Sequence, residues 1–513
     1  MNYFEYNDIK IETKFKLSDE QEEALIKLID SVVNNLEPVT LSGYAGTGKT
    51  SIIGYLEKYL KLKNERYKFI YAAPTHAATV YLGINLGYLP YTVQSIMVNR
   101  LTKKGTYVKM FSSKFMNTID NLKTNILVVD ESSMLSGEDV TNLTALCDEH
   151  FVKLIFLGDK AQIPEITKEA KKHVSDVFTK FENIHLSKVF RTEDNSILNV
   201  LTEIRKNPDG YLPIAENTEN LVFYDTTDKD LFFNTFIEKY KQEPNETVFI
   251  SYTNAVIQTF NKKVRDTLYI EDSDGLIVGE AIVGYGGYNT KQILAENLAN
   301  SVKYIVKEIN IRDSIVFIEG FSERLSQIKE DYGKMKTKYY QLSDKDCIKI
   351  KSLTEEDFNK NNIRLSAMFR KLFRMKKEAI EKGKWVDFFK FMEGFNQSIR
   401  TIDLGNNYIY NPEEHRMEIF NSKSSKHKEL RKGIPELYIE KGIDYGYAIT
   451  IHKSQGATYN NVFFNALSTE SNDNPLMENN VQVGTEGNSL NYVGMSRAAK
   501  ELHVMHGSKV KFI

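Results

Sequence analysis

The sequence predicts an α/β fold built from two parallel β-sheets. Short apolar runs alternate with helical periods from about residue 17 to 200, and a second series begins at residue 247 and resumes at residue 447. Apolar runs without alternation are typical of strands whose two faces are covered, as in parallel sheets with helical crossovers. The stretch that interrupts the second series, at about 281–440, indicates an inserted domain.

Each apolar run is expected to form one buried strand. The first series places strands at residues 39–41, 69–72, 126–129 and 153–157, and the second at 247–251, 447–451, 461–464 and 501–505. We therefore expect one domain at 1–200 and another formed by 201–280 together with 441–513. A chain of 513 residues exceeds the size at which one core stops growing, which agrees with several domains.

The inserted stretch has two parts with different patterns. Residues 279–318 alternate around a glycine cluster at 284–287, which predicts short antiparallel strands and a small β-barrel. Residues 365–391 have a helical pattern with eight Lys or Arg against three acids. On composition alone, a solvated amphipathic helical hairpin is favoured over a nucleic-acid contact.

Composition and charge narrow the class of protein. Hydrophobic residues make up 41% and charged residues 27% of the chain, which excludes disorder, a collagen-like chain and a membrane bundle. The net charge is −2, so any basic surface has to be local. Cys147 and Cys347 are too few for a disulfide framework, and no basic leader or apolar stretch of ~18 residues occurs. We expect a cytoplasmic protein.

A phosphate-binding motif lies between a predicted strand and a predicted helix. Residues 43–50 read G-Y-A-G-T-G-K-T and fit G-x-x-x-x-G-K-[ST]. Backbone N–H groups in such a loop surround phosphate oxygens, Lys49 adds a charge and Thr50 can bind Mg²⁺. An ordinary glycine-rich turn is disfavoured by the flanking strand and helix. The expected nucleotide contacts are Gly43, Ala45, Gly46, Thr47, Gly48, Lys49, Thr50 and Ser51.

Two carboxylates follow the apolar run at 126–129. Asp130 is assigned to the metal and Glu131 to the attacking water, which is the division of roles that phosphoryl transfer requires. Taken alone, such a pair is more often a helix N-cap, but beside a phosphate loop the catalytic role is favoured. Arg191 and Arg497 can supply the positive charge that meets the transition state, although spacing alone does not select them from the other arginines.

The ordered motifs of this chain resemble those of superfamily-1 helicases. They comprise residues 43–50, 130–131, 158–164 (G-D-K-A-Q-I-P), 189–192 (V-F-R-T), 448–456 (A-I-T-I-H-K-S-Q-G) and 492–498 (Y-V-G-M-S-R-A). Residues 73–78 and 251–254, with Asn261 and Arg265, further resemble the superfamily-1B branch and its Dda-like and RecD-type members. Three positions depart from the usual pattern, namely Gln94 for His, Glu165 for Pro and Ser496 for Thr.

The resemblance implies two RecA-like motor domains that hold ATP and Mg²⁺ between them. Gln21 would then contact the adenine, Gln162 the γ-phosphate and Gly456 the nucleotide, while Arg191 and Arg497 complete the site. The implied activity is a DNA helicase that moves 5′ to 3′ on single-stranded DNA in replication, recombination or repair. An RNA helicase and a nucleotide-gated binding protein with a decayed motor stay open as alternatives, since backbone contacts carry no 2′-OH signature.

The resemblance also implies a track for the nucleic acid. Its members would be Pro74, Thr75, His76, Thr92, Gln94, Ser95, Thr253, Asn254, Thr450, His452, Lys453 and Ser454. Hydroxyl and amide groups grip phosphates without reading sequence, as a motor requires. Each Ser or Thr could equally cap a turn, and His76 and His452 could be structural imidazoles.

A hairpin is predicted at residues 99–111, within an insertion at about 96–120. Lys104 and Gly105 can form its turn, and Tyr107 and Phe111 could separate base pairs, since aromatic faces replace lost stacking. A plain surface hairpin is an equal alternative for either aromatic residue. The family places its separation pin here, and the insertion at 281–440 would be an SH3-like barrel whose helical extension, about 323–400, braces the pin.

The implied partners follow from the same resemblance. They are single-stranded DNA, duplex junctions, and single-strand-binding or replication and recombination proteins, with no membrane involved. The chain would act as a monomeric motor, in the host cytoplasm if it is phage-encoded.

Overall fold

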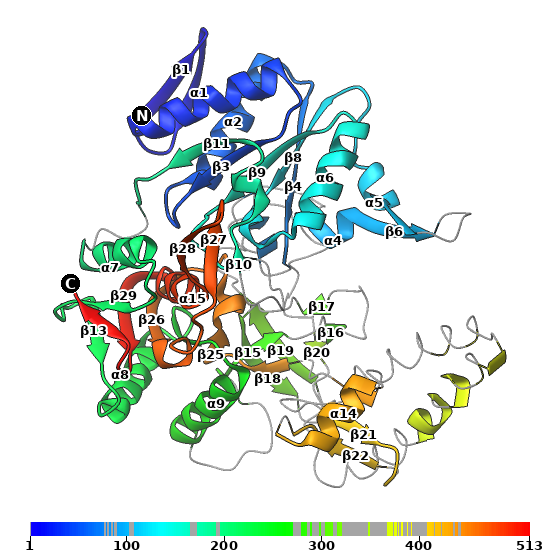
Figure 1. Ribbon diagram of the computed structural model, residues 1–513, viewed down its shortest axis with the longest axis vertical. Helices are drawn as coiled ribbons and strands as arrows, with labels where there is room; N and C mark the ends of the chain where they lie inside the picture. The colour runs from blue at the N-terminus through cyan, green and yellow to red at the C-terminus, as the bar shows by residue number, and fades with distance from the viewer. Residues whose placement is uncertain are drawn as a thin grey trace. The chain divides into compact units, whose positions relative to one another are not determined.

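The computed structural model in Figure 1 divides the chain into two compact units. Unit 1 comprises Met1–Phe260 and Ala448–Ile513, and unit 2 comprises Asn261–Tyr447. The structure describes residues 2–75, 78–79, 82–83, 86, 90–101, 107–164, 172–190, 195–269, 277, 279–284, 288–289, 297–298, 303–310, 315–320, 347–348, 367–372, 374–376, 378, 381–382, 387, 391, 408–414, 416–421, 423–433, 437–439 and 443–513. Within these residues, no helix combines the length and apolar character needed to cross a membrane.

The first sheet of unit 1 is parallel throughout and contains every strand predicted before residue 200. Its order is β11 (Glu182–Leu186), β3 (Val39–Gly43), β9 (Lys153–Gly158), β8 (Thr124–Val129), β4 (Tyr67–Ala73) and β5 (Tyr91–Thr92). Alternate residues of β8 enter different cores, since Ile126 and Val128 lie in one hydrophobic cluster and Leu127 and Val129 in another. Both faces of the sheet are therefore covered, as its apolar runs predicted.

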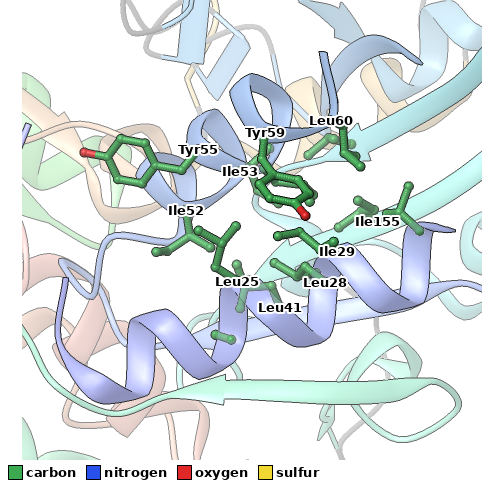
Figure 2. Packing of buried hydrophobic residues seen from close by; sticks show 14 of the residues in the cluster. Leu25, Leu28, Ile29, Leu41, Ile52, Ile53, Tyr55, Tyr59, Leu60 and Ile155 are labelled. Atoms are coloured by element: carbon green, nitrogen blue, oxygen red, sulfur yellow. The ribbon is translucent and has the colours of Figure 1, made fainter. Parts of the chain in front are cut away.

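Helices α1 (Asp19–Asn34) and α2 (Lys49–Lys63) cover one face of this sheet, and α6 (Gly137–Glu149) covers the other. Figure 2 shows Leu25 and Leu28 of α1 packed with Ile52 and Ile53 of α2 against Leu41 of the sheet. A capping box sets the start of α1: the Ser18 hydroxyl accepts from the Gln21 N–H, and the Gln21 side chain accepts from the Ser18 N–H.

The second sheet of unit 1 is also parallel and joins the chain on both sides of the insertion. Its order is β13 (Leu221–Tyr224), β29 (Ala498–Met505), β26 (Tyr459–Asn465), β14 (Thr247–Ser251) and β25 (Ala448–Thr450). The helices of this part are α7 (Asn195–Lys206), α8 (Lys229–Gln242), α9 (Asn254–Leu268) and α15 (Glu486–Met495). The predicted α/β class with two parallel sheets is confirmed.

Smaller elements complete unit 1. The strand pair β1 (Asn2–Tyr6) and β2 (Ile9–Thr13) packs on α2, and β12 (Leu212–Ile214) pairs with β30 (Val510–Phe512). In a three-stranded sheet, β27 (Pro475–Glu478) pairs with β10 (Lys172–His173) on one side and with β28 (Val481–Thr485) on the other, so the sheet links the first half of the chain to the second. Short helical turns lie at η1 (Ser132–Met134), η2 (Asp176–Phe178), η4 (Ile451–Ser454) and η5 (Ala466–Ser468).

The predicted hairpin is present. Strands β6 (Met97–Leu101) and β7 (Tyr107–Phe111) pair antiparallel, with Met97 opposite Phe111 and Leu101 opposite Tyr107. Helices α4 (Val93–Ile96) and α5 (Ser113–Met116) flank it, and it is drawn in cyan and blue in Figure 1. The proposed turn at residues 104–105 lies outside the described residues.

Unit 2 contains the antiparallel strands expected in the insertion. One sheet has the order β20 (Cys347–Ile348), β19 (Ile315–Gly320), β18 (Lys303–Asn310), β15 (Ala281–Gly284) and β24 (Ile443–Tyr445). Strand β16 (Tyr288–Asn289) pairs with β17 (Asn297–Leu298), and β22 (Arg416–Ile419), β21 (Tyr408–Asn411) and β23 (Tyr438–Ile439) form a third sheet near α14 (Ser425–Gly433). Most of the expected extension at 323–400 lies outside the described residues, and its bracing role stays a prediction.

Candidate functional site

The phosphate loop connects the end of β3 to the start of α2. Gly46 and Gly48 have φ angles of 84° and 87°, in the left-handed region that favours glycine. A Cβ on Gly43 would lie 2.7 Å from Thr47 Oγ1 and 2.8 Å from the carbonyl oxygen of Leu186, so only glycine fits there as well. The three glycines of the motif are thus explained by the backbone geometry.

Hydrogen bonds within the loop hold it closed at the start of α2. The Thr47 N–H and hydroxyl both donate to the Tyr44 carbonyl, at 3.2 and 2.9 Å. Lys49 Nζ donates to the carbonyls of Gly43 (2.6 Å) and Tyr44 (3.1 Å). Gly48, the N-cap of α2, provides no side-chain cap, so the first N–H groups of α2 form the kind of terminus that binds anions.

The two predicted carboxylates lie beside the loop, directly after β8. Asp130 Oδ2 accepts from the Thr50 hydroxyl at 3.4 Å, and Asp130 Oδ1 accepts from the Glu131 N–H at 2.8 Å. Glu131 has a φ of 52°, a left-handed conformation that non-glycine residues adopt rarely and that is frequent at functional sites. A hydroxyl and a carboxylate at this distance are the hard oxygen donors that Mg²⁺ takes, so the residues fit the implied metal.

Burial and neighbouring charges set the protonation of this pair. Burial raises the pKa of Asp130, while the Glu131 N–H, Lys49 and Thr50 oppose the rise. Burial likewise raises the pKa of Glu131, with Asp130 adding to the rise and Arg497 and Lys49 opposing it. Arg497, from the second half of unit 1, is thus one of the two positive charges that hold down the pKa of Glu131.

Arg497 is 1% exposed, and its guanidinium is held by hydrogen bonds. Nε donates to the Val493 carbonyl (2.9 Å), Nη1 to the Ala457 carbonyl (3.4 Å) and Nη2 to the Ser496 hydroxyl (3.1 Å). Ser496, which replaces the usual Thr, thus supplies a hydroxyl that contacts the arginine. The other predicted arginine, Arg191, lies outside the described residues.

Two glutamines also lie at the site. Gln162 is buried, and its Oε1 has no hydrogen-bond partner among the described residues, which leaves an amide available for a further ligand. Gln21 Nε2 donates to the Thr47 carbonyl at 3.1 Å, so Gln21 connects α1 to the phosphate loop. Its predicted contact with adenine stays a prediction, as does that of Gly456, which has a φ of 81° after η4.

The sequence did not single out Tyr492, which contacts two of the motifs. Its hydroxyl donates to Asp159 Oδ2 at 2.7 Å and accepts from the Ala45 N–H at 3.0 Å. Arg205 lies over the ring of Tyr44, with 3.8 Å from its guanidinium carbon to the ring centroid. Their contact could have been suspected from the sequence, because Tyr44, Asp159 and Tyr492 all lie within the motifs described above. The residues around Arg205 form no motif that would have indicated its role.

The predicted track residues divide into exposed and buried groups. Gln94 and Ser95 on α4, with Thr253 and Asn254 at the start of α9, are exposed. Thr75, His452 and Lys453 are partly exposed, as is Thr92, whose hydroxyl accepts from the Ser95 N–H as the cap of α4. His452 lies 5.9 Å from Tyr252, centroid to centroid, and burial lowers its pKa.

Other predicted track residues are buried. Pro74 and Thr450 are buried at the ends of β4 and β25, and His76 lies outside the described residues. Ser454 is fully buried and its hydroxyl donates to the Ile451 carbonyl at 2.7 Å, and its predicted contact with the nucleic acid stays a prediction. Its side chain closes the turn of η4, the structural role that Ser commonly has in turns.

The prediction that Phe111 separates base pairs is wrong. Phe111 is 2% exposed, and its ring centroid lies 4.7 Å from that of Phe115 and 5.2 Å from that of His150. Phe111 packs in the apolar core beside α6, because burial of a phenyl ring is favourable. Among the described side chains of the hairpin, Val98 (39%) and Val108 (45%) are the exposed apolar ones. The side chain of Tyr107, in β7, is not among those described.

Comparisons with known proteins find relatives for both the first half and most of the chain. A family model described as an AAA domain matches residues 16–222. The chain is 29% identical over 273 residues to the ATP-dependent DNA helicase dda of Enterobacteria phage T4, an alignment that covers 52% of this chain and 60% of that protein. It is 22% identical over 528 residues to an uncharacterized protein of Acanthamoeba polyphaga mimivirus, covering 93% of this chain and 97% of that one.

Solved structures are matched along most of the chain. The Pif1 helicase from Bacteroides in complex with ADP-AlF3 and ssDNA is 16% identical, and the match covers 96% of this chain and 92% of that chain with a TM-score of 0.49.

Proposed function

We propose that this chain is a superfamily-1B helicase, an ATP-dependent DNA helicase that moves along single-stranded DNA and separates duplexes. One observation carries the proposal. The carboxylate of Asp130 lies beside Thr50 of the phosphate loop, and α15, which ends two residues before the buried Arg497, contacts the same loop where the Tyr492 hydroxyl accepts from the Ala45 N–H at 3.0 Å. A nucleotide bound there contacts both parallel-sheet halves of the motor.

The residues of this site divide the work of hydrolysis. Lys49 and the N–H groups of the loop bind the phosphates, and Thr50 and Asp130 would hold Mg²⁺, which would supply positive charge beside the phosphates. Glu131 orients the attacking water and accepts its proton. Because the pKa of Glu131 is raised towards neutral pH, its carboxylate is a stronger base than an ordinary glutamate. Arg497 stabilises the charge on the transferred phosphoryl group.

The nucleic acid is proposed to follow the exposed part of the predicted track. Gln94 and Ser95 extend from the first half of unit 1, and Thr253 and Asn254 from the second. Each cycle of ATP hydrolysis then changes the contact between the two halves, so that the halves bind the strand tightly in turn. Movement from 5′ to 3′ and a role in replication or recombination are taken from the family resemblance.

The hairpin of β6 and β7 is proposed to meet the duplex. With Phe111 in the core, Val98 and Val108 are the exposed apolar side chains among those of the hairpin that the structure describes. In the register of the hairpin, residue 98 lies opposite 110 and residue 100 opposite 108, so the two valines share one face. That face is suited to pack against an unstacked base pair.

Two assays test this function. We expect ATP hydrolysis to be stimulated by single-stranded DNA and abolished in Lys49→Ala, and a duplex with a 5′ single-stranded tail to be separated while one with a 3′ tail is not. Stimulation by RNA alone would instead support an RNA helicase. Turnover equal to that of Lys49→Ala would support a binding protein whose motor is inactive.

A further inference from the structure

Three segments that lie far apart in the sequence meet at the phenolic oxygen of Tyr492. This residue, on α15, is 1% exposed. Its hydroxyl accepts from the N–H of Ala45, in the phosphate loop, and donates to Asp159, which follows β9. The oxygen therefore ties the phosphate loop and the end of a neighbouring strand to a helix of the second half.

The two hydrogen bonds are well defined. A phenol has one proton to donate, and that proton is directed at a carboxylate, which makes the bond charge-assisted. Asp159 is fixed in turn, because its Oδ1 accepts from the Ala161 N–H at 3.0 Å. Burial, with the Asp159 charge, raises the pKa of Tyr492, so the hydroxyl keeps its proton at physiological pH.

A second contact joins the same two parts. Arg205, on α7, places its guanidinium carbon 3.8 Å from the ring centroid of Tyr44 and 5.5 Å from that of Tyr492. The Thr202 hydroxyl accepts from Arg205 Nη2 at 2.7 Å and steadies this position. The second half thus contacts the phosphate loop through a cation–π contact as well as a hydrogen bond.

Tyr492 and Arg497 are mechanically connected. The Ser496 N–H donates to the Tyr492 carbonyl at 2.9 Å, and Arg497 Nε donates to the carbonyl of Val493, the neighbour of Tyr492 on α15. A shift of the phosphate loop that pulls on the Tyr492 hydroxyl therefore displaces the same helix end that holds Arg497.

We propose that Tyr492 is a positioning residue that couples the phosphate loop to the placement of Arg497, with Arg205 as its supporting contact. The proposal rests on the ATPase function proposed above. It assigns to the hydroxyl a role that ring packing does not supply, since the ring alone could be provided by phenylalanine. The coupling acts on the rate of hydrolysis more than on nucleotide binding, because phosphate binding by the rest of the loop is left in place.

The test is Tyr492→Phe in the full chain, with hydrolysis measured against ATP concentration at saturating single-stranded DNA. Loss of a charge-assisted hydrogen bond predicts about a tenfold fall in kcat, with KM for ATP within about twofold of wild type. Tyr224→Phe is the matched control, because it removes another buried hydroxyl, 3.1 Å from His503 Nδ1, away from the phosphate loop. The control is expected to keep the wild-type kcat.

The outcomes separate this inference from the proposed function. Wild type without DNA-stimulated hydrolysis contradicts both. An active wild type together with a fully active Tyr492→Phe, or an equal loss in Tyr224→Phe, contradicts the coupling alone. Should Tyr492→Phe not fold, Arg205→Met decides, because it removes the cation over Tyr44 and is expected to lower kcat without raising KM; an unchanged kcat overturns the proposal.

Discussion

The burial of Phe111 gives a prediction that separates folding from strand separation. Phe111→Ala removes a phenyl ring that is 2% exposed and packed between Phe115 and His150. Truncation of a buried aromatic side chain costs about 3–5 kcal/mol, from lost burial together with the cavity that remains. For a domain of roughly 150–250 residues, 1 kcal/mol shifts Tm by about 2–4 °C, so we expect a fall of roughly 10 °C.

The assay is thermal unfolding followed by circular dichroism, with DNA-stimulated hydrolysis measured well below the transition. Val108→Ala is the control, since that side chain is 45% exposed and is expected to change Tm by no more than about 2 °C. At the lower temperature, Phe111→Ala is expected to hydrolyse ATP at close to the wild-type rate. A variant with unchanged Tm that loses only strand separation would refute the reasoning and restore Phe111 as a wedge.

The remaining predictions concern the hairpin surface, the proposed general base Glu131 and one buried lysine. Val98→Asn together with Val108→Asn is expected to slow duplex separation more than DNA-stimulated ATPase; equal loss in both assays would argue against the wedge. Glu131→Gln is expected to bind ATP and DNA but to hydrolyse about 10²–10⁴-fold more slowly, and loss of nucleotide binding would contradict its assignment as the base. Burial lowers the pKa of Lys153 to about 8, opposed by Glu182 and Glu37, from an ordinary 10.5. Between about pH 8 and pH 10.5 the unfolded chain holds a proton that the folded chain has released, so this lysine makes the free energy of unfolding rise with pH. Urea titrations of Lys153→Met across this pH range should show a smaller rise than wild type. Identical pH slopes for the two proteins would contradict this prediction.

The strands and the phosphate loop could be predicted because their signals are local. Each uninterrupted apolar run became a parallel strand, and the glycines of the loop match positions where positive φ or close contact demands them. Asp130 and Thr50, eighty residues apart, were expected to meet because a phosphate loop and an acidic pair after a strand serve one reaction. The spacing of Thr50 and Asp130 in the sequence does not by itself predict this contact.

Other features depended on packing that the sequence does not reveal. Alternation in β7 predicts that residues 107, 109 and 111 share a face, but whether that face meets solvent or the core is decided by Phe115 and the neighbouring helices. The contact between Tyr492 and Asp159 joins residues 333 positions apart. By contrast, the first hairpin could have been found, since Asn7 and Asp8, with φ of 46° and 63°, form a two-residue turn.

The domain boundaries were also only partly predictable. The insertion was expected at 281–440, whereas unit 2 extends over Asn261–Tyr447. It begins within α9, where Arg265 forms a buried ion pair with Glu280 at 2.8 Å and Tyr447 donates to the same carboxylate at 2.9 Å. These contacts tie segments near both ends of unit 2 to Glu280, the residue before β15, and no composition change in the sequence marks them.

The most direct measurement of the central claim is hydrolysis by Arg497→Lys, which keeps a positive charge and removes the planar guanidinium. If two halves of this chain act on one triphosphate, nucleotide affinity should stay close to wild type while DNA-stimulated kcat falls by about a hundredfold or more, since an arginine in this role contributes about 10³–10⁵. Because the buried guanidinium loses its hydrogen bonds to Val493, Ala457 and Ser496, Tm is expected to fall, and hydrolysis is measured well below the unfolding transition of the variant. A variant that hydrolyses ATP at the wild-type rate would show that the second half takes no part in the reaction.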